Sequence, residues 1–183
     1  MNNGKITAVI GVRKGSERIV NKNIKPFNDT SLLENKIKTL KEVENLDEIV
    51  VTTDCDKMFA LAEQLGVVAI KRPDYYTSND CPGSENLEFI ATQVDTDYIL
   101  YTPVTSPLVK SETYEDIINI FKNLDEEYDS VVSMNYIKDF LWENGKPLNY
   151  DPLDCPRSQD MESIFRMNFG ACLLSRETMI KNK

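Results

Sequence analysis

The order in which apolar segments alternate with helix-like segments constrains this chain more than any other feature. Continuous apolar runs occupy residues 6–12, 48–54, 67–73, 98–104 and 129–137. Amphipathic stretches that predict helices lie between them, at residues 31–45, 55–66, 85–94 and 111–124. Strands that are apolar along their whole length are typical of parallel sheets covered on both faces. The sequence therefore predicts an α/β fold of the doubly wound kind, with a mostly parallel sheet flanked by helices.

Local signals mark the ends of these predicted helices. Ser31 and Glu34 have the spacing of a capping box at the start of the first helix. Ser84 and Ser111 are placed to cap the third and fourth helices, and we interpret Asp54 as a cap of the second. Gly66 fits the C-terminal end of the second helix, because glycine readily adopts the left-handed conformation found there.

The alternation stops after residue 137, where a different pattern begins. Asn144 and Gly145 stand between two short apolar runs, which is a β-hairpin signal. We interpret residues 138–165 as a protruding hairpin arm within a single domain that spans residues 1–183. Isolated two-stranded hairpins are marginal in water, so this one is expected to pack on a second copy of the chain. Trp142 is the natural anchor of such a homodimer.

Composition excludes several kinds of function. The chain has no histidine, which removes Ser-His-Asp triads, Cys-His dyads and histidine-ligated metals. A formal net charge of −9 argues against a nucleic-acid partner, and no apolar run is long enough to span a membrane. The four cysteines include no C-x-x-C pair, so we expect free thiols and a cytoplasmic protein. Phosphate chemistry assisted by an oxygen-bound Mg²⁺ fits the residues that remain.

A basic loop follows the first predicted strand of this acidic chain. Its cations are Arg13, Lys14, Arg18, Lys22 and Lys25. Gly15 and Ser16 allow a tight turn whose backbone N–H groups can hold an anion. The loop lies beyond the carboxyl end of a strand, where ligands of such sheets bind. It lacks the spacing of a P-loop or of a dinucleotide fingerprint, so we interpret it as a separate kind of phosphate-binding loop.

Several segments, taken in order, resemble one family. They are VRKGSERIVNKN with PF, VVTTD, KRPDYYTSND, TSPL, PRSQ and FRMNFGA, and together they extend over nearly the whole chain. This ordered set is similar to the acylneuraminate (CMP-sialic acid) cytidylyltransferases. The resemblance implies a nucleotide-diphospho-sugar-transferase fold and a nucleotidyltransferase of polysaccharide biosynthesis. It implies a reaction in which CTP and an acidic nine-carbon sugar give the CMP-sugar and pyrophosphate.

The resemblance also implies roles for particular residues. Arg13 and Lys22 are expected to be catalytic, holding the phosphates and stabilising charge on the leaving pyrophosphate. The nucleotide is expected to contact Arg13, Gly15, Ser16, Lys22, Asn23, Arg72 and Ser84. The sugar is expected to contact Arg157, Gln159, Arg166 and Asn168, because an arginine can hold a carboxylate in two parallel bonds.

Departures from the family pattern leave alternatives open. Pro103 and Val104 stand where the family often has Gln, Val109 where it often has a basic residue, and Phe169 interrupts the Asn-Gly-Ala segment. A late Asp-x-Asp segment that would hold Mg²⁺ is expected beyond residue 183, so CTP binding with slow turnover is expected of this chain. The alternatives are another sugar nucleotidyltransferase, such as a CMP-KDO synthetase, and a non-catalytic CTP-binding domain.

Overall fold

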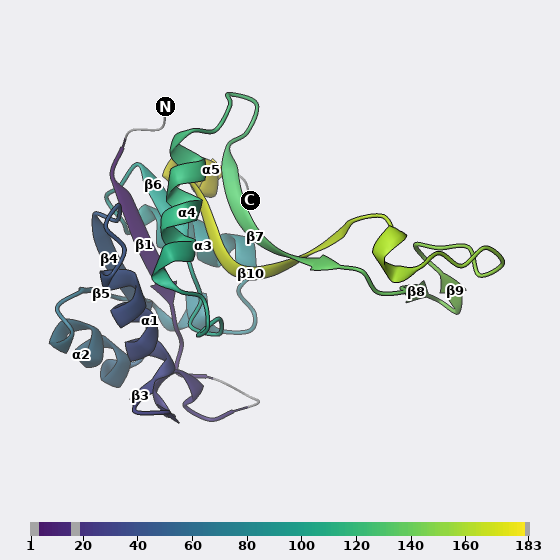
Figure 1. Ribbon diagram of the computed structural model, residues 1–183. Helices are drawn as coiled ribbons and strands as arrows, with labels where there is room; N and C mark the ends of the chain where they lie inside the picture. Colours follow the sequence, from purple (N-terminus) through teal and green to yellow (C-terminus); the bar gives the residue numbers. More distant parts are fainter. Residues whose placement is uncertain (1–3, 16–18, 182–183) are drawn as a thin grey trace. The chain divides into compact units, whose positions relative to one another are not determined.

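The structure is a computed structural model that describes residues 4–15 and 19–181 (Figure 1). The strands are β1 (Ile6–Gly11), β2 (Pro26–Phe27), β3 (Thr30–Ser31), β4 (Glu48–Thr53), β5 (Val68–Lys71), β6 (Tyr98–Tyr101), β7 (Ser130–Ile137), β8 (Trp142–Glu143), β9 (Lys146–Pro147) and β10 (Ile164–Ser175). The α-helices are α1 (Leu32–Lys41), α2 (Asp56–Gln64), α3 (Gly83–Thr92), α4 (Ser111–Lys122) and α5 (Arg176–Lys181). Short 3₁₀ turns are η1 (Lys22–Ile24), η2 (Asp74–Thr77) and η3 (Ser158–Asp160). Each predicted strand and helix is present, with ends shifted by a few residues.

The main sheet has the strand order β5-β4-β1-β6-β10-β7. β1 pairs in parallel with β4 and with β6, so that Val9 lies opposite both Val50 and Tyr101. β4 also pairs in parallel with β5, whereas β10 runs antiparallel to β6. The prediction of a mostly parallel sheet flanked by helices is confirmed. The sequence analysis did not identify β10 as a strand of this sheet.

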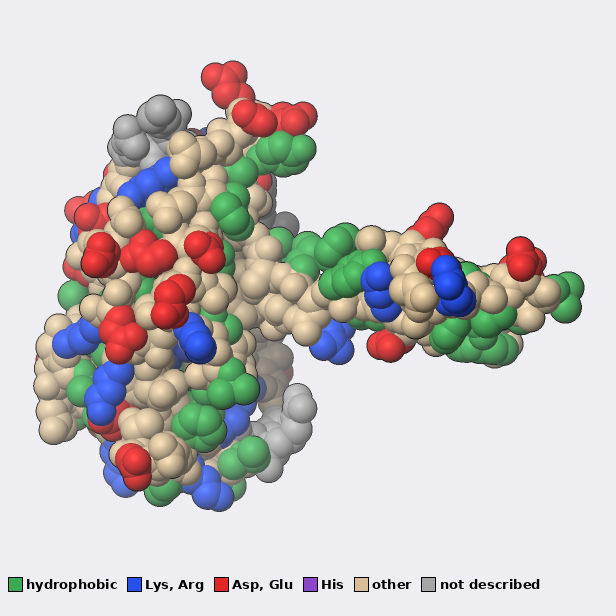
Figure 2. All heavy atoms as spheres, viewed as in Figure 1, with side chains coloured by type: hydrophobic (Ala, Val, Ile, Leu, Met, Phe, Trp, Pro, Cys, Tyr) green, Lys and Arg blue, Asp and Glu red, His purple; other side chains and the backbone are tan. Residues whose placement is uncertain are grey.

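The chain divides into two compact units. The first comprises residues 1–132 and 170–183, and the second, which we call the hairpin unit, comprises residues 133–169. The hairpin unit contains the segment predicted as the 138–165 arm. Figure 2 shows hydrophobic side chains gathered on its surface. No helix within the described ranges 4–15 and 19–181 has the length and apolar character needed to cross a membrane.

The hairpin predicted from the Asn-Gly pair is confirmed. β8 and β9 pair antiparallel, with Trp142 opposite Pro147. Asn144 has a φ of 50° and Gly145 a φ of 78°, so both residues of the turn are left-handed. A type I′ turn requires positive φ at both central residues, which is why Asn-Gly is favoured there.

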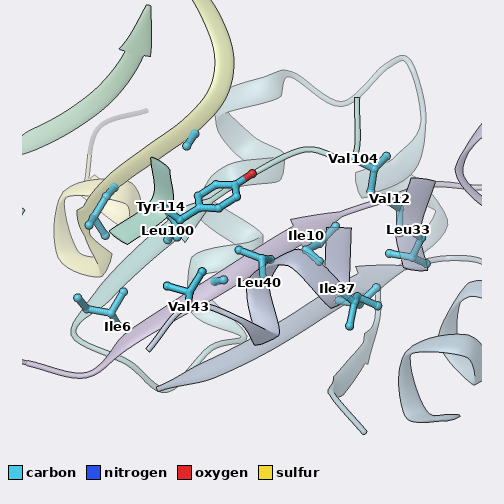
Figure 3. Packing of buried hydrophobic residues seen from close by; sticks show 14 of the residues in the cluster. Ile6, Ile10, Val12, Leu33, Ile37, Leu40, Val43, Leu100, Val104 and Tyr114 are labelled. Carbon is cyan, nitrogen blue, oxygen red and sulfur yellow. The ribbon is translucent and has the colours of Figure 1, made fainter. Parts of the chain in front are cut away.

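Helices cover both faces of the sheet in the first unit. On one face, α1, α2 and α4 pack on alternate strand residues, including Ile6, Ile10 and Leu100 (Figure 3). On the other, α3 and α5 pack on the residues between them, such as Val9 and Ile99. Successive strand residues point to opposite faces, so a strand between two helical layers has to be apolar throughout. This packing fixes the sheet edge at which the polar loops gather.

The helix signals were only partly correct. Ser31 is the N-cap of α1, and its Oγ accepts a hydrogen bond from the Glu34 N–H at 3.2 Å. Gly66 follows the last residues of α2 with a φ of 67°, as predicted. Ser84 and Ser111 lie inside the first turns of α3 and α4, whose N-caps are Pro82 and Lys110. Those two cap predictions were wrong because each helix begins before the first residue of its predicted N-terminal turn, so each serine lies within the helix.

Candidate functional site

A cavity opens at the carboxyl end of the parallel strands in the first unit. It has a volume of about 470 Å³, and its wall comes from the loop after β1 and the segment after β6. The lining residues are Gly11, Val12, Arg13, Gly15, Ile19, Lys22, Asn23, Pro103, Val104 and Thr105. Parallel strands end at a common edge, so loops distant in sequence meet there. Four of the residues predicted for a nucleotide, Arg13, Gly15, Lys22 and Asn23, are thus brought together.

Arg13 is held in place while part of its guanidinium stays available. Its Nη1 donates to the Thr77 carbonyl at 2.7 Å and to Asn79 Oδ1 at 2.9 Å. A guanidinium carries five N–H donors, so those of Nε and Nη2, which have no partner among the described residues, can bind a ligand in the cavity. Arg13 can therefore tie the loop after β5 to the cavity and bind a phosphate oxygen at the same time.

Lys22 and Gly15 complete the cationic side of the cavity. Among the described residues, the Lys22 ammonium makes no ion pair with a carboxylate. Gly15 is exposed, and a Cβ added there would meet no atom within 4 Å. Packing therefore does not require glycine at this position, whereas an accessible backbone N–H is useful to an anion. This arrangement suits a ligand with several negative charges.

Asn23 shapes the loop from inside. Its exposed fraction is 5%, and its Nδ2 donates to the Arg13 carbonyl at 3.1 Å. This bond spans ten residues and closes the loop on itself. The contact with cytosine or ribose expected of Asn23 stays a prediction. The structure gives this side chain a role in holding the backbone of Arg13.

Asp54 orders the same loop and is not the helix cap that the sequence suggested. Its Oδ1 accepts from the Lys14 backbone N–H at 2.8 Å, and its Oδ2 accepts from Thr77 Oγ1 at 3.3 Å. The N-cap of α2 is Cys55 instead. The carboxylate thus links the loops that follow β1 and β5, and it occupies one N–H that an anion could otherwise use.

Arg72 is buried behind the cavity, with an exposed fraction of 6%. Its Nη2 donates to the Val12 carbonyl at 2.7 Å, and its Nη1 donates to Asn86 Oδ1 at 3.0 Å. Burial lowers the pKa of this guanidinium, and the nearby Tyr101 and Asp54 act in the opposite direction. Its Nε has no hydrogen-bond partner within the described ranges. An unpaired buried donor is costly. The nucleotide contact expected of Arg72 stays a prediction.

The other predicted site residues lie elsewhere or outside the description. Ser16 falls in residues 16–18, which the structure does not describe. Ser84 lines a separate cavity of about 360 Å³ between η2 and α3, with Tyr76 and Phe89. The four residues predicted for the sugar all belong to the hairpin unit, namely Arg157, Gln159, Arg166 and Asn168.

Within the hairpin unit, some of these side chains already have partners. Arg157 Nε donates to Asp160 Oδ2 at 2.6 Å, and Asn168 bonds to Ser133 and Asn135. Lys138 donates to the Gln159 carbonyl at 3.1 Å. Arg166 is exposed on β10. Their contact with a sugar stays a prediction.

The sequence analysis missed Lys36 and Tyr114, which lie behind the cavity wall. Lys36 lies on α1 with an exposed fraction of 1%, and Tyr114 on α4 is fully buried. A signal was available, because Lys36 interrupts the apolar face formed by Leu33, Ile37 and Leu40. A lysine in such a stripe is rarely buried without a reason.

The described part of the chain contains no ready-made cluster of metal ligands. Within residues 4–15 and 19–181, no three Asp, Glu or Cys side chains gather closely enough to hold one. The cavity presents cations instead. The Mg²⁺ expected from the resemblance therefore stays a prediction.

A model of the cytidylyltransferase family matches residues 7–177, which is nearly the whole chain. The chain belongs to the cytidylyltransferase family. The match begins in β1 and ends in α5, so it includes the cavity, Arg72 and the hairpin unit. The recognition made from the ordered segments is confirmed at the level of the family.

Relatives of this cytidylyltransferase differ in the sugar that their names specify. The N-acylneuraminate cytidylyltransferase of Escherichia coli O18:K1:H7 (strain RS218 / NMEC) is 31% identical over 71% of this chain and 31% of its own length. The 3-deoxy-manno-octulosonate cytidylyltransferase of Bdellovibrio bacteriovorus (strain ATCC 15356 / DSM 50701 / NCIMB 9529 / HD100) is 28% identical over 64% of this chain and 46% of its own length. The chain thus spans less than half of the length of these two relatives.

Solved structures of nucleotidyltransferases share the fold. A CMP:2-keto-3-deoxy-manno-octonic acid synthetase complexed with CTP aligns with a TM-score of 0.73 and 16% identity, covering 96% of this chain and 76% of that one. A 4-diphosphocytidyl-2C-methyl-D-erythritol synthase from Anaerococcus prevotii DSM 20548 aligns with a TM-score of 0.68 and 14% identity, covering 96% and 73%. At this identity the likeness confirms the nucleotidyltransferase-like fold.

Proposed function

We propose that this chain transfers CMP from CTP to an acidic nine-carbon 2-keto sugar, a nonulosonic acid, and releases pyrophosphate. The observation that carries the proposal is the cavity with Arg13 and Lys22 at the carboxyl end of the sheet, in a chain of the cytidylyltransferase family. A structural neighbour with the same fold is complexed with CTP, which supports CTP as the nucleotide. A triphosphate supplies the several negative charges that this cavity suits.

In the proposed reaction, the sugar hydroxyl oxygen attacks the α-phosphorus of CTP. The bond to the β-phosphate breaks, pyrophosphate leaves, and the hydroxyl proton is released. Arg13 and Lys22 would face the β- and γ-phosphates, where negative charge grows as that bond breaks. Positive groups that are already in place stabilise such charge without reorganisation. Arg72 would support the nucleotide site from behind the loop, through its bond to the Val12 carbonyl and its positive charge.

The leading proposal and the second candidate differ in the identity of the sugar substrate. The order of the matched segments and the bacterial acylneuraminate relative favour a nonulosonic acid. The octulosonate names of other relatives favour the eight-carbon sugar KDO as a second candidate. Either sugar carries a carboxylate, which an arginine such as Arg166 can hold. The third candidate is a domain that binds CTP without turnover.

The test is pyrophosphate release by the 183-residue chain with CTP, Mg²⁺ and a panel of nonulosonic acids and KDO. We expect slow release that requires both CTP and a nonulosonic acid. Release with KDO alone would favour the second candidate. CTP binding without release for any sugar would favour a binding domain, and no binding of CTP would contradict the proposal as a whole.

A second copy of the chain is the proposed partner of the hairpin unit. Nine large apolar side chains in this unit are 41–96% exposed: Met134, Tyr136, Phe140, Trp142, Leu148, Leu153, Phe165, Met167 and Phe169. Within the same unit, Met161 is the one buried apolar side chain. Monomeric proteins rarely expose apolar surface on this scale. We therefore propose that the hairpin unit forms a homodimer interface. We also propose that the protein is cytoplasmic, because free thiols such as its four are typical of a reducing compartment.

Trp142→Ala is expected to weaken this dimer at least tenfold. Trp142 is 59% exposed and packs edge-on against Tyr150 at 6.3 Å, so its outer face is open to a partner. Truncating a tryptophan at the centre of an interface commonly costs about 2 kcal/mol or more. Light scattering over a concentration series measures the change. Ile120→Ala is the matched control, since Ile120 is 54% exposed on α4 in the first unit. A wild-type chain that is monomeric, with no effect of Trp142→Ala, would contradict the dimer.

A further inference from the structure

Lys36 is a buried cation that lies behind the cavity wall formed by residues 103–105. Its Nζ donates to the Ser106 carbonyl at 3.0 Å and to Tyr114 Oη. The ammonium also lies 5.0 Å from the centre of the Tyr114 ring. No carboxylate of the described residues pairs with it. A buried charge without a counter-ion lowers stability, so its presence calls for a compensating role.

In the hydrogen-bond network that starts at Lys36, each group donates to the next one. Thr102 Oγ1 donates its single proton to the Gly170 carbonyl at 2.9 Å. Thr102 and Tyr114 lie 2.8 Å apart through their hydroxyls, so Tyr114 has to be the donor of that pair. Its own oxygen then accepts from Lys36. The result is one chain of donors from Lys36 through Tyr114 and Thr102 to Gly170.

This chain holds the cavity wall at both ends. Pro103, Val104 and Thr105 line the cavity, and Thr102 and Ser106 flank them directly. Tyr114 bonds to Thr102 at one end, while Lys36 bonds to Ser106 at the other. Asn35, the neighbour of Lys36 on α1, adds a bond from its Nδ2 to the Pro107 carbonyl at 3.2 Å.

We propose that Lys36 and Tyr114 are positioning residues: they fix the Pro103–Thr105 wall from behind, and the charge of Lys36 favours an anionic ligand in the cavity. The identity of that ligand as CTP rests on the proposed function. The positioning of the wall does not, because it follows from contacts within the chain. Burying this charge lowers the stability of the folded chain. In return, the positive potential of the ammonium favours an anion in the cavity.

The pH dependence of ligand binding distinguishes this role from a purely structural one. Burial lowers the pKa of Lys36 to about 8. Tyr114 is the titratable side chain in contact with the ammonium, and burial raises the pKa of its hydroxyl. A bound anion favours the charged form of Lys36, so binding above about pH 8 takes up a proton. The affinity of the wild-type chain should then fall as the pH rises through this range.

The experiment compares the wild-type chain with Lys36→Met, Tyr114→Phe and Lys41→Met. Lys41 is the matched control: it lies on α1 and donates to the Leu65 carbonyl, away from the wall. Calorimetry measures CTP and tripolyphosphate binding between pH 7.5 and 9.5. Amide hydrogen exchange is followed without ligand at Thr102 and Val109, whose N–H groups donate to the Val9 and Ser106 carbonyls at the two ends of the wall.

For wild type and Lys41→Met we expect affinity to fall about threefold to tenfold over this range, since one pKa unit of coupling corresponds to a factor of ten. Lys36→Met should show no such fall. Tyr114→Phe keeps the charge and should keep the pH dependence. In both Lys36→Met and Tyr114→Phe, the amides of Thr102 and Val109 should exchange at least tenfold faster than in Lys41→Met.

An unchanged pH dependence in Lys36→Met, together with unchanged exchange in Tyr114→Phe, would overturn the proposal. If Lys36→Met does not fold, unchanged exchange in Tyr114→Phe alone overturns the positioning role. If the wild-type chain binds neither CTP nor tripolyphosphate, the proposed function and the role of the charge both fall. Faster exchange in Tyr114→Phe would then still support the fixed wall.

Discussion

Arg13→Ala is expected to reduce the affinity for CTP roughly ten- to hundred-fold, because a charge-assisted hydrogen bond contributes about 1.5–3 kcal/mol. The guanidinium lines the cavity, and it also bonds to Thr77 and Asn79. Its removal therefore deletes a phosphate contact and releases the loop after β5. Arg13→Lys should recover part of the loss, since an ammonium keeps the charge without the planar fork.

Calorimetry with CTP at fixed ionic strength measures this effect. Lys25→Ala is the matched control, because Lys25 belongs to the same basic loop but is exposed and does not line the cavity. The control should lose little affinity, since an exposed charge is screened by salt. Equal affinities for wild type and Arg13→Ala would contradict a phosphate-binding role for this loop.

Lys36 is expected to make the stability of the fold depend strongly on alkaline pH. Its pKa is about 8 in the folded chain, against 10.5 for the same group in water. Between these values the unfolded chain holds a proton that the folded chain has lost, so stability rises with pH. Each pH unit contributes about 1.4 kcal/mol, which gives about 2–3 kcal/mol between pH 7 and pH 10.

Urea unfolding of wild type and Lys36→Met across this pH range measures the contribution. The difference between their free energies of unfolding removes the titration that the two chains share. We expect wild type to gain stability relative to Lys36→Met as the pH rises. Parallel pH profiles for the two chains would show that the folded state does not depress the pKa of Lys36.

The parallel part of the fold could be predicted because its signals are local. The apolar runs that became β1, β4 and β6 are buried on both faces, and the helices between them carry their own periodicity. β10 could not be predicted in this way. The part of it in the hairpin unit exposes Phe165, Met167 and Phe169, so it lacks the continuous burial of the other strands. Its place beside β6 depends on a pairing between residues 71 to 77 positions apart.

For the site, the sequence located the loop but not its supports. Arg13, Gly15, Lys22 and Asn23 were predicted together because they follow one strand, and they share one cavity. Ser84 was predicted to contact the nucleotide because of the resemblance, but it lines a different cavity. Asp54, Lys36 and Tyr114 act on the loops from elements that become neighbours only in the folded chain. Contacts of this kind are barely visible in the sequence. The one signal here is Lys36, a charged residue within the apolar face of α1.

The position of β10 between β6 and β7 has a consequence for the order in which the sheet can assemble during synthesis. β7 ends at residue 137, yet the strand that joins it to the sheet is complete only at residue 175. At 5–20 residues per second, this interval lasts roughly 2–8 s on the ribosome. Until then the edge of β6 that faces away from β1 has no partner strand. An unpaired edge of this kind can pair with another chain. The nascent protein is thus most exposed to aggregation while its hairpin unit is being made.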